Sequence, residues 1–386
     1  MKKLAIIITH PIQYYAPVFK LLAQKIDIKV FYTWGESSIS KHDPGFGKMI
    51  KWDIDLLEGY DYQWIKNIAT NPGSHHFNGI INPDLITSIK TWQPDTILVY
   101  GWAYKSHLSV IRYFKNKIPV LFRGDSTLLN KKPGFKNLIR TIYLKWVYNH
   151  IDYALYTGTN NKAYYKKYGL KNSQLIFVPH AVDNDRFSIR YPVESAELRS
   201  SLKIEKEAIL ILFAGKFESV KNVELLLSAF INLNHPNAHL LLVGNGINEL
   251  TLKTAAAKSN VEAKIHFMDF KNQSFMPVIY QAANLFCLSS RSETWGLSVN
   301  EAMACGKAIL VSDKTGCAAD LVKTNINGCV FTSGSKNDIE EKLNLLVNKG
   351  KEGLFQMGET SKQIIKDWNF TVQADNIINY KNGRNK

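Results

Sequence analysis

The segment RSETWGLSVNEAMACG, residues 291–306, decides how this chain folds. It directly follows the apolar run Leu285–Leu288, which is predicted to be a buried strand. Leu297, Glu301 and Ala304 recur at helical spacing, so the segment is predicted to turn from a loop into a helix. The sequence therefore indicates a strand, a connecting loop and a helix in immediate succession.

The same segment combines two carboxylates with a predicted phosphate nest. Glu293 lies in the loop, and Glu301 follows eight residues later, in the expected first turn of the helix. Gly296 allows the backbone to approach a ligand closely. The N–H groups of Gly296, Leu297 and Ser298 would point outward at the positive end of the helix dipole. The pattern predicts carboxylates for sugar hydroxyls beside a site for a diphosphate.

A structural interpretation of these residues stays open at this point. Ser298-x-x-Glu301 also has the spacing of a capping box, in which Glu301 reaches back to the backbone N–H of Ser298. In that case Glu301 would stabilise the start of the helix and would contact no ligand.

The complete string from Glu293 to Glu301, followed by AMACGKAILV (302–311), resembles the E-x7-E signature of family 4 glycosyltransferases of the group 1 type. The resemblance covers most of the chain and is most specific between about residues 176 and 331. It implies an α/β protein of the GT-B fold, with two Rossmann-like doubly wound domains facing across a cleft. It also implies transfer of a sugar from a nucleoside-diphosphate sugar with retention of the anomeric configuration. The resemblance assigns a catalytic role to Glu293 and assigns Glu301 to binding of the nucleotide's ribose.

A chain of 386 residues is long enough for two domains. The resemblance implies an acceptor-binding domain over residues 1–185 and a nucleotide-sugar-binding domain over 186–365. The remaining helix, 366–386, is expected to cross back to the first domain. Residues 176–187 resemble the segment between such domains. Asp183-Asn184-Asp185 spells the metal motif of a different glycosyltransferase fold, and we interpret it as part of this linker.

Two lysines in the expected second domain are candidates for diphosphate binding. Lys216 and Lys221 lie in the loop between a predicted strand, Ile209–Phe213, and a predicted helix, Val223–Phe230. A strand, a glycine and two lysines before a helix form the pattern that a phosphate site needs. The family resemblance assigns both lysines to the donor diphosphate. Considered in isolation, they would be ordinary solvated surface residues.

Two polar residues in the first domain are candidate contacts for the acceptor or the reacting sugar. His10 follows the predicted first strand, Leu4–Thr9, and ligands of parallel sheets bind at the carboxyl ends of strands. Alternatively, His10 caps a turn before Pro11. The predicted strand Val120–Phe122 ends near Arg123 and Asp125, and the sequence does not decide between these two.

Charge is concentrated in the first half of the chain. The net charge is +15, and residues 1–200 hold 27 Lys and Arg residues against 15 Asp and Glu residues. Such a field favours an anionic partner: a phospholipid surface, a lipid diphosphate or nucleic acid. Within residues 131–146, basic and apolar residues alternate near the helical period, which fits either an in-plane membrane helix or a crossover helix with a solvated face. The basic residues are Lys132, Lys136, Arg140 and Lys145, and the apolar ones are Phe135, Ile139, Tyr143 and Trp146.

The remaining composition indicates a cytoplasmic protein without metal. No two cysteines have C-x2-C spacing, so buried free thiols are expected at Cys287, Cys305, Cys317 and Cys329. No cofactor is expected, because the lysines and backbone amides would stabilise the leaving diphosphate. The N-terminal apolar run ends after five residues and predicts a strand in place of a signal peptide. A peripheral location on the inner face of the plasma membrane is compatible with the basic charge.

Three other functions compete with the transferase as explanations of the sequence. A GT-B sugar-nucleotide epimerase would share the fold and the diphosphate chemistry but would use no acceptor. A dinucleotide-dependent oxidoreductase would need G-x-G-x-x-G after its first strand, which this chain lacks. A nucleic-acid-binding module would need a recognisable reading element, and none is found. The preferred prediction is a glycosyltransferase acting on a glycan or lipid-linked acceptor in surface polysaccharide or lipopolysaccharide assembly, without a nucleic acid partner.

Overall fold

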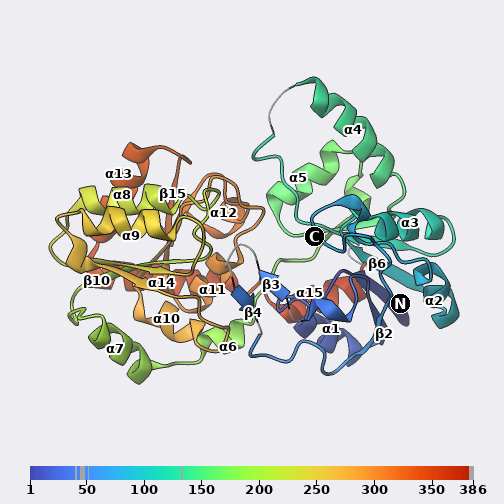
Figure 1. The fold of residues 1–386 in the computed structure, drawn as a ribbon, viewed down its shortest axis with the longest axis horizontal. Helices are drawn as coiled ribbons and strands as arrows, with labels where there is room; N and C mark the ends of the chain where they lie inside the picture. Colours follow the sequence, from blue (N-terminus) through green and yellow to red (C-terminus); the bar gives the residue numbers. More distant parts are fainter. Residues whose placement is uncertain (40, 44–47, 51, 132–133, 382–386) are drawn as a thin grey trace. The chain divides into compact units, whose positions relative to one another are not determined.

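The structure is a computed structural model that describes every residue except 40, 44–47, 51, 132–133 and 382–386 (Figure 1). The chain divides into two units. The first unit comprises Met1–Lys41, Ile54–His180 and the segment from Phe370, and the second comprises His42–Asp53 and Ala181–Asn369. The segment that follows the second unit thus belongs to the first.

The first unit is built on a parallel seven-stranded sheet in the order β5-β2-β1-β6-β7-β8-β9. Residues 4–8 of β1 are almost completely buried, because helices cover both faces of the sheet. The strands are β1 (Lys3–Ile8), β2 (Asp27–Tyr32), β5 (Asp61–Trp64), β6 (Thr96–Tyr100), β7 (Val120–Arg123), β8 (Tyr153–Tyr156) and β9 (Leu175–Phe177).

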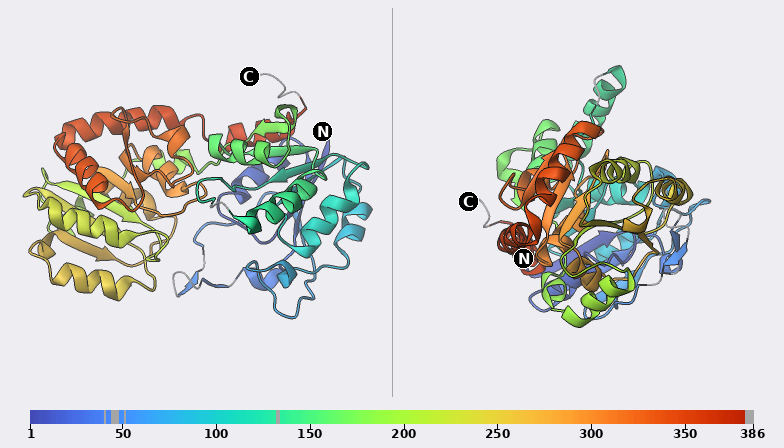
Figure 2. Two further views of the ribbon diagram at one scale, coloured as in Figure 1. Left: turned by 90° about the horizontal axis from the view of Figure 1, so that it is seen from above. Right: turned by 90° about the vertical axis from the view of Figure 1, so that its left-hand side faces the viewer.

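Six helices surround this sheet (Figure 2). They are α1 (Ala16–Ala23), α2 (Leu85–Trp92), α3 (Lys105–Phe114), α4 (Phe135–Tyr148), α5 (Thr159–Lys167) and α15 (Phe370–Ile378). Helix α15 packs against α1, and Lys25 forms an ion pair with Asp375. Tyr380, just after α15, is buried in the same hydrophobic cluster as Phe19 of α1. The last helix therefore completes the core of the first unit, although almost two hundred residues separate it from the preceding part of that unit.

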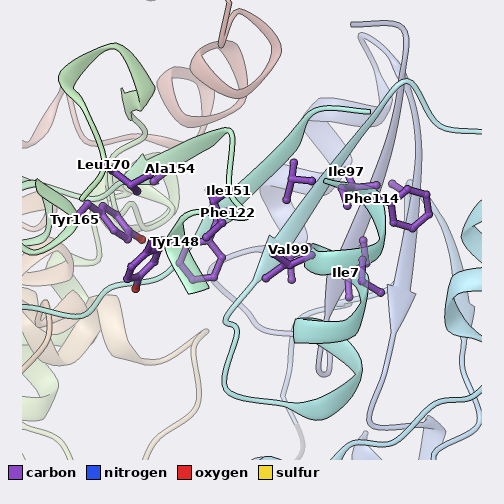
Figure 3. Packing of buried hydrophobic residues seen from close by; sticks show 14 of the residues in the cluster. Ile7, Ile97, Val99, Phe114, Phe122, Tyr148, Ile151, Ala154, Tyr165 and Leu170 are labelled. Atoms are coloured by element: carbon purple, nitrogen blue, oxygen red, sulfur yellow. The ribbon is translucent and has the colours of Figure 1, made fainter. Parts of the chain in front are cut away.

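The second hydrophobic cluster of this unit is rich in aromatic rings (Figure 3). Phe122 of β7 meets the ring of Tyr148 at 5.7 Å and the ring of Tyr165 at 6.2 Å, both edge-on. Ile7 and Val99 extend the cluster along the sheet. Tyr148 is the last residue of α4, so this cluster anchors the end of that helix.

One strand of this sheet lies in a part of the sequence that does not indicate it. Residues 36–75 are mostly polar and rich in turn-forming residues, yet β5 pairs in parallel with β2. Alternate residues of β5 are partly buried, and the rings of Tyr62 and Trp64 lie 6.0 and 4.9 Å from that of Tyr32. β5 lies at the edge of the sheet, where only one face needs apolar residues, so its short alternating pattern was hidden among polar neighbours.

A buried histidine links the ends of two strands in this unit. The Nε2 atom of His107 lies 2.8 Å from the Thr33 hydroxyl, and its Nδ1 atom lies 3.0 Å from the carbonyl oxygens of Tyr100 and Gly101. Carbonyls only accept, so Nδ1 carries the proton and donates it. Burial lowers the pKa of His107 from 6.5 to about 4.

This histidine makes stability depend on pH. Because its folded-state pKa lies below the unfolded value, the unfolded chain binds the proton first, and stability is lost as the pH falls below about 6.5. We expect His107→Gln to reduce the loss of unfolding free energy between about pH 7 and about pH 5 by about 2 kcal/mol. Urea titrations at both pH values measure this loss. His75→Gln, at an exposed histidine, is the control and should leave the loss unchanged.

The second unit holds a parallel six-stranded sheet in the order β12-β11-β10-β13-β14-β15. Its strands are β10 (Ile209–Ala214), β11 (Ala238–Val243), β12 (Ile265–Met268), β13 (Leu285–Leu288), β14 (Ala308–Ser312) and β15 (Gly328–Phe331). A separate two-stranded sheet joins β3 (Lys41–Asp43) and β4 (Lys48–Ile50). Strands β10 and β13 were predicted from the sequence as Ile209–Phe213 and Leu285–Leu288, with bounds that differ by a residue or less.

The helices of this unit follow the strands in alternation. They are α6 (Asn184–Ser188), α7 (Pro192–Ser201), α8 (Val223–Leu233), α9 (Glu249–Ala257), α10 (Met276–Ala282), α11 (Leu297–Ala304), α12 (Ala318–Leu321), α13 (Lys336–Val347) and α14 (Gly350–Ile365). Within the described part of the chain, no helix is long and apolar enough to cross a membrane.

In both sheets the strand order reverses beside the first strand of the unit. β1 lies between β2 and β6, and β10 lies between β11 and β13. Each unit is therefore a doubly wound α/β unit, as the sequence predicted, and ligands bind such sheets in the crevice where the order reverses. In the second unit this point lies between the loop after β10 and the loop after β13.

Candidate functional site

Hydrogen bonds to backbone carbonyl oxygens join the loop after β13 to the loop after β10. The Ser289 hydroxyl, just after β13, lies 3.0 Å from the carbonyl oxygens of both Lys221 and Asn222. The N–H of Arg291 donates to the carbonyl of Val220 at 2.8 Å. These contacts hold Lys221 beside the carboxyl end of β13.

The loop after β14 fixes the backbone of Glu293 from the other side. The Glu293 N–H donates to the carbonyl of Lys314, and the Gly316 N–H donates to the carbonyl of Glu293, both at 3.0 Å. Glu293 and Thr315 also form a parallel β-bridge. Glu293 therefore lies in a short strand-like segment with fixed neighbours, although the sequence indicated only a loop.

The side chains of Lys221 and Glu293 form an ion pair. Their exposed fractions are 23% and 17%, so the pair is largely removed from water but still open on one side. The sequence assigned Lys221 to the diphosphate and Glu293 to the sugar, with no indication that they touch. The structure brings them together at the point where the strand order reverses.

Helix α11 begins just after Gly296, a position where both the backbone angle and the surrounding atoms require glycine. Gly296 is the N-cap residue and has a φ of +100°, in the left-handed region that favours glycine. A Cβ at this position would lie 3.0 Å from the Thr315 methyl group and 3.1 Å from a Leu288 methyl group. No side chain caps the helix, and the first N–H groups of an α-helix, including that of Leu297, have no partner within the helix.

The capping-box interpretation of Glu301 is wrong, and so is its placement in the first turn. The helix starts at Leu297, so Ser298 lies inside it, and Glu301 is its fifth residue. Glu301 is only 4% exposed, and its carboxylate accepts a hydrogen bond of 2.8 Å from the Tyr280 hydroxyl on α10. The sequence could not indicate this partner, because Tyr280 belongs to another helix. Binding of the ribose by Glu301 stays a prediction.

Removing the Tyr280 hydroxyl is expected to destabilise the second unit. A buried carboxylate that loses a donor costs about 1.5 kcal/mol, so Tyr280→Phe should lower the free energy of unfolding by about this amount. Urea denaturation measures the change. In the Glu301→Gln background the same substitution should cost much less, since the charge is gone. Equal costs in both backgrounds would show that the hydroxyl does not act on Glu301.

Lys216 lies in the same loop as Lys221, near its start and partly exposed. The N–H of Phe217 donates to the carbonyl of Asn245 at 2.9 Å, so this loop rests on the loop after β11. A Cβ at Gly244 would lie 2.0 Å from the carbonyl oxygen of Gly215. The Gly244-Asn245-Gly246 sequence therefore serves the packing of two loops.

Comparison with known families identifies this part of the chain. The family described as glycosyl transferases, group 1, matches residues 194–365. Residues 194–365 form a group 1 glycosyl transferase domain. The domain contains every residue from Lys216 to Glu301 that was assigned to the donor, and it ends with the last residue of α14.

Curated relatives match parts of the chain. Mannosylfructose-phosphate synthase of Agrobacterium fabrum is 34% identical over 158 residues, which is 38% of this chain and 34% of that protein. N,N'-diacetylbacillosaminyl-diphospho-undecaprenol alpha-1,3-N-acetylgalactosaminyltransferase of Campylobacter jejuni is 26% identical over 225 residues, covering 56% and 58% of the two chains. The chain spans about a third to a half of the length of the first curated relatives that it matches.

Solved structures resemble the whole chain. The Anabaena protein Alr3699/HepE, crystallised in complex with UDP, has a TM-score of 0.74 at 15% identity, with 98% of this chain and 99% of that chain covered. The GT-B fold predicted from the sequence is therefore confirmed, and the first unit shares it although the group 1 glycosyl transferase domain lies wholly in the second.

In the first unit, the structure separates Arg123 from Asp125. Arg123 is only 1% exposed, and its guanidinium donates to the carbonyl oxygens of Val178 at 2.8 Å and Pro179 at 3.2 Å. It therefore holds the segment that leads out of this unit toward the group 1 glycosyl transferase domain. Asp125, two residues further on, is partly exposed and stays the candidate contact for acceptor or sugar.

His10 lies just beyond β1 and is also partly exposed. Its Nδ1 atom is 2.8 Å from the Thr9 hydroxyl, and its ring meets that of Trp34 edge-on at 5.4 Å. β1 and β7 run parallel in one sheet, so His10 and Asp125 both follow strands at the carboxyl edge. Their contact with a substrate stays a prediction.

His180 was not singled out from the sequence. It is buried, and its ring stacks on that of Tyr15 with centroids 5.8 Å apart and planes 7° apart. Burial, assisted by the nearby Arg123 charge, lowers the pKa of His180 well below its usual range. The partners Tyr15 and Arg123 are distant in sequence, so no local pattern could indicate this cluster.

Asp183, the first residue of the D-x-D sequence, has a structural role. The carboxylate of Asp183 accepts a hydrogen bond of 3.0 Å from the N–H of Arg186 and caps α6. Over the described residues, no three His, Cys, Asp or Glu side chains are grouped so that they could hold a metal ion. The four cysteines are buried free thiols, as expected from their spacing.

Proposed function

We propose that this chain is a retaining glycosyltransferase that moves a sugar from a nucleoside-diphosphate sugar to a glycan or lipid-linked acceptor. The observation that carries the proposal is the ion pair between Lys221 and Glu293, at the strand-order reversal and beside the start of α11. The GT-B fold and the match of residues 194–365 to the group 1 glycosyl transferases also support it.

The diphosphate would replace Glu293 as the partner of Lys221. A phosphate group carries more charge than a carboxylate and offers more acceptor oxygens, so it competes well for an ammonium group. Lys216 and the first amides of α11, from Gly296 and Leu297, would add to this site. Together they would stabilise the charge that builds on the leaving diphosphate, without a metal ion or other cofactor.

Glu293, released from the ion pair, would orient the hydroxyls of the sugar. Its negative charge would also lie near the anomeric carbon, which becomes positive as the bond to the diphosphate breaks. The acceptor hydroxyl would attack from the same face that the diphosphate leaves, which retains the configuration. Glu301 would bind the ribose of the nucleotide.

We expect Glu293→Gln to lower turnover by about tenfold or more, while nucleotide affinity is kept or slightly raised because Lys221 loses its competing partner. The amide keeps the size of the side chain but removes the charge near the anomeric carbon. The measurement is turnover and KM with the preferred donor. A variant with unchanged turnover would remove Glu293 from the reaction. Asp313→Asn, at a carboxylate on the neighbouring loop whose side chain is 43% exposed, is the matched control.

A lipid-linked acceptor fits the basic first unit. The Campylobacter jejuni relative carries an undecaprenol-linked diphosphate in its name, and such an acceptor is anionic and membrane-bound. Assembly of a surface polysaccharide, including lipopolysaccharide, on the cytoplasmic face of a membrane is therefore the proposed setting.

A thermal-shift panel with UDP, GDP, ADP, TDP and NAD tests the donor. A ligand that binds the folded state raises the melting temperature by mass action. UDP comes first, because the Anabaena structure contains it. A shift with one diphosphate supports the proposal, and a shift with NAD alone contradicts it. Conversion of the sugar nucleotide into its epimer, without any acceptor, would identify the epimerase alternative.

A further inference from the structure

Helix α4 exposes an apolar face to solvent. Five large apolar side chains of this helix are between 38% and 65% exposed: Leu138, Ile139, Ile142, Tyr143 and Trp146. Figures 1 and 2 show α4 at the periphery of its own unit. Single exposed apolar residues are ordinary on protein surfaces, but five on one helix of 14 residues form a patch that requires an explanation.

The five side chains lie together around the helix. At about 100° per residue, they occupy a continuous arc of about 140°. The opposite side carries Leu144 and Val147, which are buried in the core. Lys145 is exposed at one margin of the apolar arc, about 20° from Leu138, and Arg140 is exposed about 60° beyond the other margin. Helices that lie in a membrane interface have this arrangement, with apolar residues facing the acyl chains and cations at the edges.

Aromatic rings at the patch are ordered by contacts with one another. Tyr143 and Trp146 stack at 5.7 Å, and Trp102 meets Tyr143 edge-on at 5.6 Å. The guanidinium of Arg112, on α3, lies 5.3 Å from the centre of the Trp146 ring. Tryptophan, tyrosine and arginine are favoured at the level of lipid headgroups.

The segment that contains the patch carries almost only positive charge. Asp125 is the single acidic residue between positions 96 and 151. The same stretch contains ten basic residues: Lys105, Arg112, Lys115, Lys117, Arg123, Lys131, Lys132, Lys136, Arg140 and Lys145. Of these, Arg123 is buried, and Lys115 is paired with Asp152. Of the residues grouped here from the sequence, Lys132 and the side chains of Phe135 and Lys136 lie outside the described part of the structure.

We infer that this face of α4 docks on an anionic phospholipid bilayer, with its five apolar side chains among the lipids and Arg112, Arg140 and Lys145 at the headgroups. A protein partner would need acidic groups facing this patch, whereas an anionic bilayer supplies both the apolar layer and the opposite charge. The inference deepens the proposed function, because a lipid-linked acceptor would lie in the same bilayer. Of the two interpretations of this helix that the sequence left open, the inference adopts the in-plane membrane helix.

Flotation with lipid vesicles tests the inference on the full chain. We expect binding to vesicles of phosphatidylcholine mixed with phosphatidylglycerol, weak binding to phosphatidylcholine alone, and weaker binding at high salt. The double variant Leu138→Ser, Ile142→Ser should reduce binding to the mixed vesicles by about tenfold or more. Phe355→Ser, at a 55% exposed apolar residue of α14, is the matched control and should bind like the native chain.

Two readouts make the outcomes decisive. Quenching of tryptophan fluorescence by brominated lipids should decrease in Trp146→Phe if that ring enters the interface, and should stay at the native level if another part of the chain binds. Equal flotation of the double variant and the native chain, or no binding of the native chain to mixed vesicles, would overturn the inference. No nucleotide is present in these assays, and a melting-temperature shift with a nucleoside diphosphate is recorded separately. A failure of the membrane-docking inference is thereby distinguished from a failure of the transferase proposal.

Discussion

Replacing Lys221 by alanine is expected to weaken binding of the nucleoside diphosphate by at least about a hundredfold, roughly 2.7 kcal/mol. The ammonium group is largely removed from water, so its attraction to a phosphate is screened less than at the surface. The Glu293 carboxylate would also stay near the phosphates without a counter-ion, and like charges repel. Isothermal titration with the diphosphate that raises the melting temperature measures the loss.

The control is Lys258→Ala, at an exposed lysine of the same domain, which should leave affinity within about twofold. The double variant Lys221→Ala, Glu293→Gln is informative, because removal of the carboxylate should recover part of the affinity. The fold should be affected little, since the lost pair is partly solvated and worth about 1 kcal/mol. Unchanged affinity in Lys221→Ala would show that the diphosphate binds elsewhere.

Replacing Gly316 by alanine is expected to lower the free energy of unfolding by about 3 kcal/mol or more. A Cβ at this position would lie 1.8 Å from the carbonyl oxygen of Thr294 and 2.6 Å from its carbonyl carbon. Both are backbone atoms, so no side chain can rotate away, and the loop of Glu293 must move. Urea denaturation measures the loss, and we expect donor affinity to fall as well.

Gly334→Ala provides the comparison within the same unit. Gly334 has a φ of +80° but no atom near the position of a Cβ. Its replacement should cost about 1 kcal/mol through backbone strain alone. If both variants lose the same amount of stability, close packing between the loops after β13 and β14 is not what requires glycine at position 316.

The site therefore combines a fixed backbone with an exchangeable pair of side chains. Ser289, Gly316 and the bridge at Thr315 hold three loops together, so the positions of Lys221 and Glu293 are set before any ligand arrives. In the proposed function, only their side chains would have to change partners. A preorganised backbone of this kind lowers the cost of stabilising charge during a reaction.

The sequence determined the elements and the fold class of this protein. In the second unit, continuous apolar runs such as Leu285–Leu288 alternate with helical patterns, and each run is a strand of a buried parallel sheet. Such patterns are local, because burial on both faces of a sheet demands apolar side chains at every position. The same locality allowed helix α11 to be predicted from the 291–306 segment, although Glu301 was placed a turn too early within it. Edge strand β5 has only one buried face and therefore lacks such a continuous apolar run.

The tertiary structure alone decided which functional groups meet. Lys221 and Glu293 are 72 residues apart, and Tyr280 reaches Glu301 from a different helix. Arg123 binds carbonyls 55 and 56 residues away and was thereby removed from the candidate contacts. Likewise, only the fold shows which face of α4 is buried and which is exposed. Hydrogen bonds and ion pairs act between atoms in space, and a pattern along the chain contains no information on partners that another strand or helix supplies.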